Sequence, residues 1–186
     1  MNEIIQLIKE RRNTKNFVDK DVSKIDIETL LDAAIWAPNH RDTQPWRFVV
    51  IDKESSLRDK ISEGIISVKE LSSGKKQTDE QIESIVKYVQ SRPVLIFVFS
   101  LIDSNPIITE ENYGAVCCAI QNISLAATSM DLAVGWSTGK IAQIQNLTDM
   151  FELKEELKVV GVLTIGYPSS HQSKQRTDFN EITSWL

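Results

Sequence analysis

Residues 110–132, E-E-N-Y-G-A-V-C-C-A-I-Q-N-I-S-L-A-A-T-S-M-D-L, are the stretch that decides the fold. They are rich in Ala, Ile, Leu and Cys, with hardly a charge in the middle. This composition over such a length predicts one long helix. A helix that is apolar all round lies either at the centre of a domain or in an obligate subunit interface, and both alternatives are open at this point.

Further elements are predicted on either side of this helix. Strands are expected at 46–52, 93–101, 132–137 and 159–167. The second of these is almost wholly apolar, as expected of a strand that is covered on both faces. Helices are expected at 2–11, around 27–35 and near 142–152. Because helices and strands interleave irregularly, the sequence predicts one α+β domain over residues 1–186, built around one sheet.

Residues 54–91 are the least hydrophobic part of the chain. They are polar and helical in tendency, and the pattern breaks around Ser72, Ser73 and Gly74. We interpret this segment as a candidate for a mobile lid.

Composition excludes several classes of function. The 186 residues carry a net charge of −5, whereas a general nucleic-acid or membrane-surface binder needs a basic excess. The longest apolar stretch, 94–102, is far below the ~20 residues that span a bilayer. Cys117 and Cys118 are adjacent and cannot join distant segments, which fits a reducing compartment. With no secretory signal at the start, the sequence predicts a cytoplasmic protein.

Familiar catalytic motifs are absent from the sequence. It has no P-loop, no glycine-rich dinucleotide fingerprint, no H-E-x-x-H and no G-x-S-x-G. The spacing of its two histidines does not predict a metal site. Metal hydrolysis, P-loop chemistry and triad catalysis are therefore not expected.

Three polar clusters carry the remaining chemistry, and each also has a purely structural interpretation. R-R-N-T-K at 11–15 gathers three cations suited to phosphate, or simply ends a helix. A-P-N-H-R-D-T-Q-P-W at 37–46 is a polar loop that could serve a site, or an ordinary connection. G-W-S-T-G at 135–139 permits close backbone approach to a flat polar ligand, or forms a strand-end turn.

Together and in this order, the three clusters and the closing V-V-G-V-L-T-I-G-Y-P resemble the FMN-dependent nitroreductase family, most of all its compact bacterial branch. The resemblance covers the chain apart from residues 54–91. It implies an α+β fold with a mainly antiparallel central sheet flanked by helices. It also implies a homodimer with FMN at the subunit interface and the 110–132 helix at its core. Cys117 and Cys118 are then small buried hydrophobic residues.

The resemblance also implies roles for individual residues. Arg11, Arg12 and Asn13 are expected to hold the phosphate and ribityl chain of FMN. Lys15 is expected to reach the pyrimidine edge of the flavin and to favour its anionic reduced form by charge. Arg176 is expected to be a second phosphate-binding cation, with Lys174 as the alternative.

Two further groups complete the expected flavin site. The other subunit is expected to bring Trp36 and His40 toward the flavin, Trp36 by packing or stacking. Three residues of the third cluster are expected to line the ring, namely Trp136, Ser137 and Thr138. Because the flavin carries the chemistry, no catalytic side chain of the protein's own is expected.

The implied activity is transfer of hydride from NAD(P)H through FMN to an oxidised small-molecule acceptor, such as a nitroaromatic or a quinone, in a ping-pong cycle. One alternative is a specialised flavin reaction, such as dehalogenation or flavin destruction, with a pocket built from residues 54–91. Another is a non-catalytic flavin-binding or regulatory protein. The sequence does not choose between NADH and NADPH.

Overall fold

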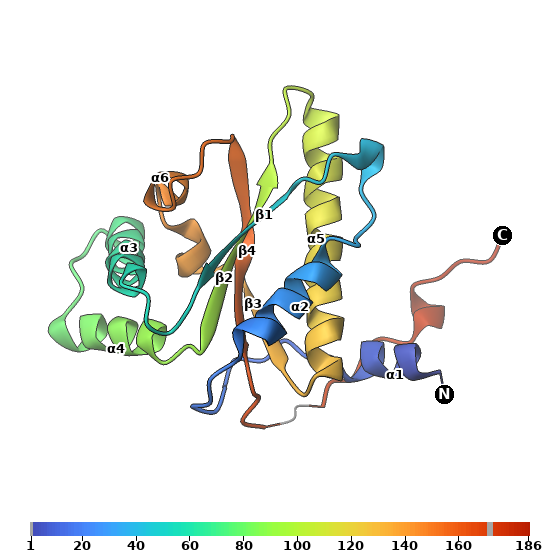
Figure 1. Cartoon of the computed structure of the whole chain (residues 1–186), viewed down its shortest axis with the longest axis horizontal. Coiled ribbons are helices and arrows are strands. Elements are labelled where there is room, and N and C mark those ends of the chain that lie inside the picture. Colours follow the sequence, from blue (N-terminus) through green and yellow to red (C-terminus); the bar gives the residue numbers. More distant parts are fainter. Residues whose placement is uncertain (1, 171–172) are drawn as a thin grey trace.

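The structure is a computed structural model that describes residues 2–170 and 173–186. Its centre is an antiparallel four-stranded sheet with the strand order β1-β2-β4-β3 (Figure 1). The strands are β1 (Trp46–Ile51), β2 (Val94–Leu101), β3 (Ala133–Ser137) and β4 (Leu157–Gly166). All four lie within two residues of the predicted bounds, and the expected α+β architecture is confirmed.

Strand β2 is buried on both faces, as its apolar sequence predicts. Side chains alternate along it, so that Val94, Ile96 and Val98 enter one hydrophobic core. Leu95, Phe97 and Phe99 enter a second core on the opposite face. The sheet is therefore the middle layer between two layers of helices.

The first face of the sheet is covered by α2 (Lys24–Ala34) and α5 (Pro106–Ser129). Helix α5 begins four residues before the predicted start because the side chain of Asn105 caps it and Pro106 fits its first turn. It ends three residues early, where the chain turns through a positive φ of 56° at Asp131. The long apolar helix itself is confirmed.

Helix α5 buries only one of its faces within the chain. The opposite face exposes Gly114, Cys118 and Gln121 to solvent. Within one chain Cys118 is exposed because it points away from the sheet, and Cys117 is half-buried, so the burial expected of both cysteines in a subunit interface stays a prediction. Burial raises the pKa of the Cys117 thiol, which keeps it in its neutral form.

The second face of the sheet is covered by α3 (Leu57–Ser73) and α4 (Asp79–Gln90), which occupy the polar segment 54–91. The predicted break is confirmed at Gly74, which ends α3 in the left-handed conformation. Arg58 of α3 is fully buried and donates to the carbonyl oxygens of Asp52 and Pro93. This segment is thus an integral layer of the fold, and its interpretation as a mobile lid is not supported.

The predicted helix near 142–152 is wrong. In its place are a short 3-10 turn, η2 (Lys140–Gln143), and a single helical turn, α6 (Leu147–Met150). Between them Asn146 has a positive φ of 56°, a conformation that a continuous right-handed helix excludes.

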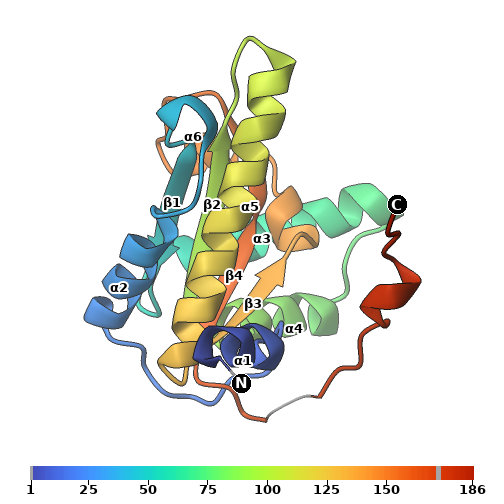
Figure 2. The same cartoon turned by 90° about the vertical axis from the view of Figure 1, so that its right-hand side faces the viewer.

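The remaining elements lie at the periphery. Helix α1 (Glu3–Glu10) lies across the C-terminal end of α5, and the tail, with the 3-10 turn η3 (Phe179–Glu181), runs along the outside (Figure 2). The turn η1 (His40–Asp42) lies near the opposite end of α5. None of the described helices is long and apolar enough to cross a membrane.

Candidate active site

The 11–15 loop is pinned to the edge strand β3. The Thr14 amide donates to the Val134 carbonyl oxygen at 2.9 Å, and the amide of Trp136 donates to Oδ1 of Asn13 at 2.6 Å. The first and third sequence clusters, more than a hundred residues apart, therefore form one continuous surface. Asn13 serves this surface as a structural link.

Gly135 is the reason that the loop can lie so close to β3. A Cβ atom at this position would clash with the backbone oxygen of Thr14. Because that oxygen belongs to the backbone, only a shift of the whole loop would relieve the clash. The absence of a side chain at Gly135 is thus what allows the two clusters to join.

Arg11 and Arg12 differ in role despite being neighbours. The guanidinium of Arg12 donates to the carbonyl oxygens of Lys9, Glu10 and Arg11 at the end of α1. This is the helix-end function that the sequence left open as the structural alternative. Arg12 is expected to act on a ligand mainly through its charge.

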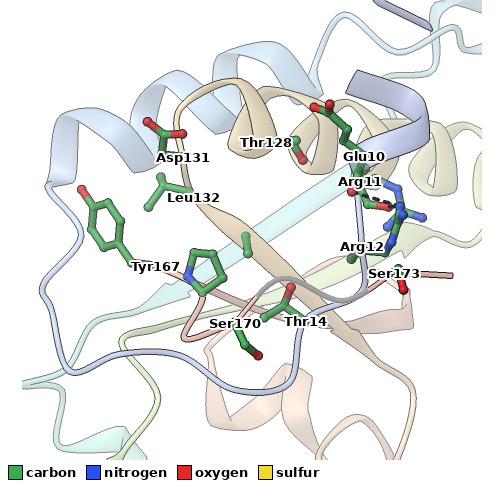
Figure 3. A pocket seen from close by; sticks show the side chains of 12 residues that line it. Glu10, Arg11, Arg12, Thr14, Thr128, Asp131, Leu132, Tyr167, Ser170 and Ser173 are labelled. Atoms are coloured by element: carbon green, nitrogen blue, oxygen red, sulfur yellow. Dashed lines mark hydrogen bonds between the residues drawn. The ribbon is translucent and has the colours of Figure 1, made fainter. Parts of the chain in front are cut away.

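Arg11 and Arg12 both line a cavity of about 800 Å³, together with Thr128 and Ser173 (Figure 3). Burial lowers the pKa of the Arg11 guanidinium, and the positive charges of Arg176 and Arg12 lower it further. The charge of Arg176, in the tail, thus reaches Arg11, although Arg176 is not among the residues that line the cavity. The cavity wall also carries the carboxylates of Glu10 and Asp131, so an anion such as a phosphate would be held there by the Arg11 and Arg12 guanidinium groups.

Lys15 is exposed, and its backbone is held by a residue that the sequence reasoning missed. Nη1 of Arg92 donates to the Lys15 carbonyl oxygen at 2.6 Å. The same guanidinium lies 4.2 Å from the ring centroid of Tyr88, and its buried Nε has no hydrogen-bond partner among the described residues. The only signal in the sequence is an arginine directly before Pro93, where the buried strand begins.

The third cluster presents its backbone more than its side chains. The indole of Trp136 lies over Gly161, where a Cβ would meet it, and Nε1 lies 3.4 Å from the Val160 carbonyl oxygen. Oγ of Ser137 accepts from the Gly139 amide at 3.2 Å and tightens the turn that follows β3. Thr138 is exposed. The Trp136 side chain is thus part of the sheet surface, and Ser137 and Thr138 form the accessible edge.

Trp36 and His40 are not brought to this surface within one chain. Trp36 is 80% exposed, and His40 is exposed in η1. Oγ1 of Thr43, in the same segment as His40, donates to Oδ1 of Asn112 at 2.8 Å. Thr128, at the cavity of Arg11, is sixteen residues further along α5, which is about 24 Å at 1.5 Å per residue. One chain therefore holds only part of the predicted site.

Comparison with known proteins agrees with this geometry. The model of the Nitroreductase family matches residues 8–167. The Bacillus subtilis protein named "Putative NAD(P)H nitroreductase YfhC" is 26% identical over 94% of this chain and 90% of its own length. A solved structure from Desulfovibrio desulfuricans, described as a "putative nitroreductase in complex with FMN", has a TM-score of 0.77 and 25% identity, and covers 100% of this chain and 98% of its own.

A third relative has a different named activity. The iodotyrosine deiodinase of Hydra vulgaris is 29% identical over 97% of this chain and 72% of its own length. The family match spans the 11–15 loop, all four strands and both helical layers. The joined surface of the loop and β3 and the arginine cluster agree with this match. The family model covers most of the chain, and the chain therefore belongs to the nitroreductase family.

Proposed function

We propose that the chain is an FMN-dependent oxidoreductase that passes electrons from NAD(P)H to an oxidised small molecule, such as a nitroaromatic or a quinone, in a ping-pong cycle. The observation that carries this proposal is the pair of guanidinium groups, Arg11 and Arg12, at the cavity beside the pinned 11–15 loop, with the charge of Arg176 close enough to act on Arg11. Such a cluster suits the phosphate of FMN, and the relative of known structure that contains FMN has the same fold.

When bound, FMN supplies the redox chemistry, so the residues of the chain bind, orient and tune it. Arg11 and Arg176 would hold the phosphate, and the charge of Arg12 would support them. The ammonium of Lys15 would lie toward the flavin, because Arg92 fixes the backbone from which it projects. A cation at that place favours a reduced, anionic ring.

We propose further that residues 1–186 form one domain that acts in the cytoplasm as a homodimer with two flavin sites. Trp36 and the exposed face of α5 support this, since both present surface that one chain leaves uncovered. Trp36 and His40 of one chain would then complete the site of the other, beside Ser137 and Thr138.

The first experiment is the absorption spectrum of the purified protein under anaerobic conditions, followed by NADH or NADPH. We expect a bound-flavin spectrum that bleaches within seconds and returns when a nitroaromatic or a quinone is added. Whichever nicotinamide bleaches it faster is the donor. A protein that takes up no flavin after incubation with FMN would contradict the proposal.

A second candidate function is reductive dehalogenation on the same scaffold, which the similarity to iodotyrosine deiodinase favours. It predicts that a halogenated phenol reoxidises the reduced flavin faster than a nitroaromatic does, with release of halide. Stopped-flow reoxidation with the two acceptors decides between the candidates.

A further inference from the structure

A second cavity, of about 280 Å³, opens beside the third sequence cluster. It lies between α3, α4 and η2, and Ser137 at the end of β3 is part of its wall. Ligand sites usually have volumes of about 300–1,000 Å³, and the volume of this cavity is just below that range. A cavity of this size suits a molecule with one ring. Residues 54–91, which the resemblance does not explain, supply two of its three sides.

The wall of this cavity combines isoleucine side chains and one aromatic ring with two lysines and the hydroxyl groups of Ser84 and Ser137. Ile85 of α4 and Ile141 of η2 are buried and form part of the lining, and the Tyr88 ring lies at the same place. Flat rings pack favourably against such side chains, face to face with an offset or edge to face. The body of the ligand is therefore expected to be planar and apolar.

The charges of the cavity are all positive. Among the described residues that line it, the ionisable side chains besides Tyr88 are Lys69 and Lys140, and none is a carboxylate. Both lysines are half-buried, and the ion pairs among the described residues involve neither of them. By contrast, the neighbouring cavity along α3 has Lys60 together with Glu63 and Asp149. An anionic group on a ligand in the cavity beside Ser137 would meet the two cations Lys69 and Lys140 and no opposing charge.

The cavity is also connected to the predicted flavin surface. Tyr88 stacks against the guanidinium of Arg92, and Arg92 holds the Lys15 carbonyl oxygen. Ser137 follows Trp136, whose amide is bonded to Asn13. A ligand in the cavity would thus lie next to both segments that are expected to line the flavin.

We propose that this cavity is the acceptor site and that Lys69 and Lys140 select acceptors bearing a carboxylate on a planar ring. The inference rests on the proposed function, since it names the class of molecule that the reduced flavin serves. Both lysines are specificity-determining residues, because they contact the carboxylate and not the reacting atoms.

The test uses the FMN-loaded protein and two matched pairs of probes. Benzoate and benzamide, which differ in charge and are not reduced, report binding by isothermal titration calorimetry. The acceptors 4-nitrobenzoate and 4-nitrobenzamide report kcat/KM. We expect the wild type to prefer the charged member of each pair. Lys69→Gln and Lys140→Gln should each weaken the charged member about three- to fivefold, as for a partly exposed ion pair, and leave the neutral one unchanged.

Lys60→Gln is the matched control, because it removes a cation from the same helix α3 outside this cavity. An equal effect of Lys60→Gln, or equal binding of benzoate and benzamide, would overturn the inference. So would a rise in the FMN dissociation constant or in KM for NAD(P)H in the two lysine variants, because the cavity would then serve the cofactor or the donor.

The two proposals fail in different ways. Reduction of the flavin by NAD(P)H without a preference for benzoate would overturn the acceptor site and leave the oxidoreductase function standing. A preference for benzoate that both lysine variants lose, in a protein whose flavin NAD(P)H does not reduce, would support the anion site and overturn the oxidoreductase function.

Discussion

The two regions expected to meet at the flavin are built in opposite ways. The 11–15 loop is fixed by hydrogen bonds to β3 and to Arg92, and it lies against Gly135. The segment that contains Trp36 and His40 exposes both side chains. Its turn also has positive φ angles at Arg41, Asp42 and Gln44, which cost free energy in residues other than glycine.

This difference suggests how the site is divided between chains. The first region is complete within one chain because the contacts that shape it are intrachain contacts. In the second region an exposed tryptophan and a strained turn indicate a surface that gains its contacts from elsewhere. The following predictions test that division, beginning with the largest expected effect.

Mixing two defective chains should restore flavin binding. Arg11→Glu damages the first region and Trp36→Glu the second, so we expect neither homodimer to bind FMN tightly. A mixed dimer has one site with both defects and one intact site, and should bind one FMN per two chains. Flavin absorbance of the co-expressed, doubly tagged dimer measures this.

The control for this experiment pairs Arg11→Glu with a chain carrying both substitutions, which leaves no intact site in any dimer. No recovery in the test pair would place both regions in the same chain's site, whereas recovery in the control would show that the substitutions do not abolish FMN binding.

Gly135→Ala should move the 11–15 loop off β3. We expect reduction of bound FMN by NAD(P)H to slow by about a hundredfold, since a displacement near 1 Å can have that effect on a reacting geometry. Stopped-flow absorbance measures the rate. Gly139→Ala is the control, because its Cβ would lie 3.4 Å from Oγ of Ser137, an ordinary contact. Normal reduction in Gly135→Ala would show that the loop position does not matter.

Removing Arg11 or Arg176 should weaken FMN binding selectively. A hydrogen bond to a charged group is worth about 1.5–3 kcal/mol, so each alanine variant should raise the dissociation constant about 10- to 100-fold. Riboflavin, which lacks the phosphate, should bind to variants and wild type alike, as measured by flavin fluorescence. Lys174→Ala serves as the control. A larger loss from Lys174→Ala than from Arg176→Ala would reverse the assignment of the second cation.

Arg92→Met should loosen the first region without removing a ligand contact. The loss of the bond to the Lys15 carbonyl and of the stack on Tyr88 is expected to lower the free energy of unfolding by about 1–2 kcal/mol. Urea denaturation measures this. Arg92→Lys keeps the charge but cannot stack in the same way, and should recover part of the loss. Unchanged unfolding in Arg92→Met would contradict the positioning role.

The smallest expected effect concerns the turn between α3 and α4. Oε1 of Glu70 accepts from the Gln77 amide, and Oε2 pairs with Lys76. The amide hydrogen bond, followed by the bond to Lys76, lowers the pKa of Glu70. Its stabilisation is therefore full above the ordinary carboxyl pKa and is lost as the pH falls through the lowered one. The stability of wild type should fall more steeply below about pH 5 than that of Glu70→Gln, as thermal melts at several pH values would show.

The sequence by itself determined the elements with strong local or compositional signals. The apolar run at 93–101 indicated a strand covered on both faces, and the long stretch from 110 indicated a helix at the centre of a domain or in a subunit interface. The three clusters carried the family resemblance because their residue types and order are local properties of the chain. The prediction of a helix near 142–152 was wrong because the spacing of apolar residues gives no information about the backbone turn at Asn146.

The tertiary structure alone decided which side chains share a site. Periodicity describes one element at a time, so it could not bring Arg92 to Lys15 across 77 positions of the chain. It also could not show that Arg12, which lines the same cavity as Arg11, donates to carbonyl oxygens at the end of α1. Nor could it show that the polar segment 54–91 covers the second face of the sheet. These outcomes depend on long-range packing, in which each contact forms only because the rest of the fold places its partners together.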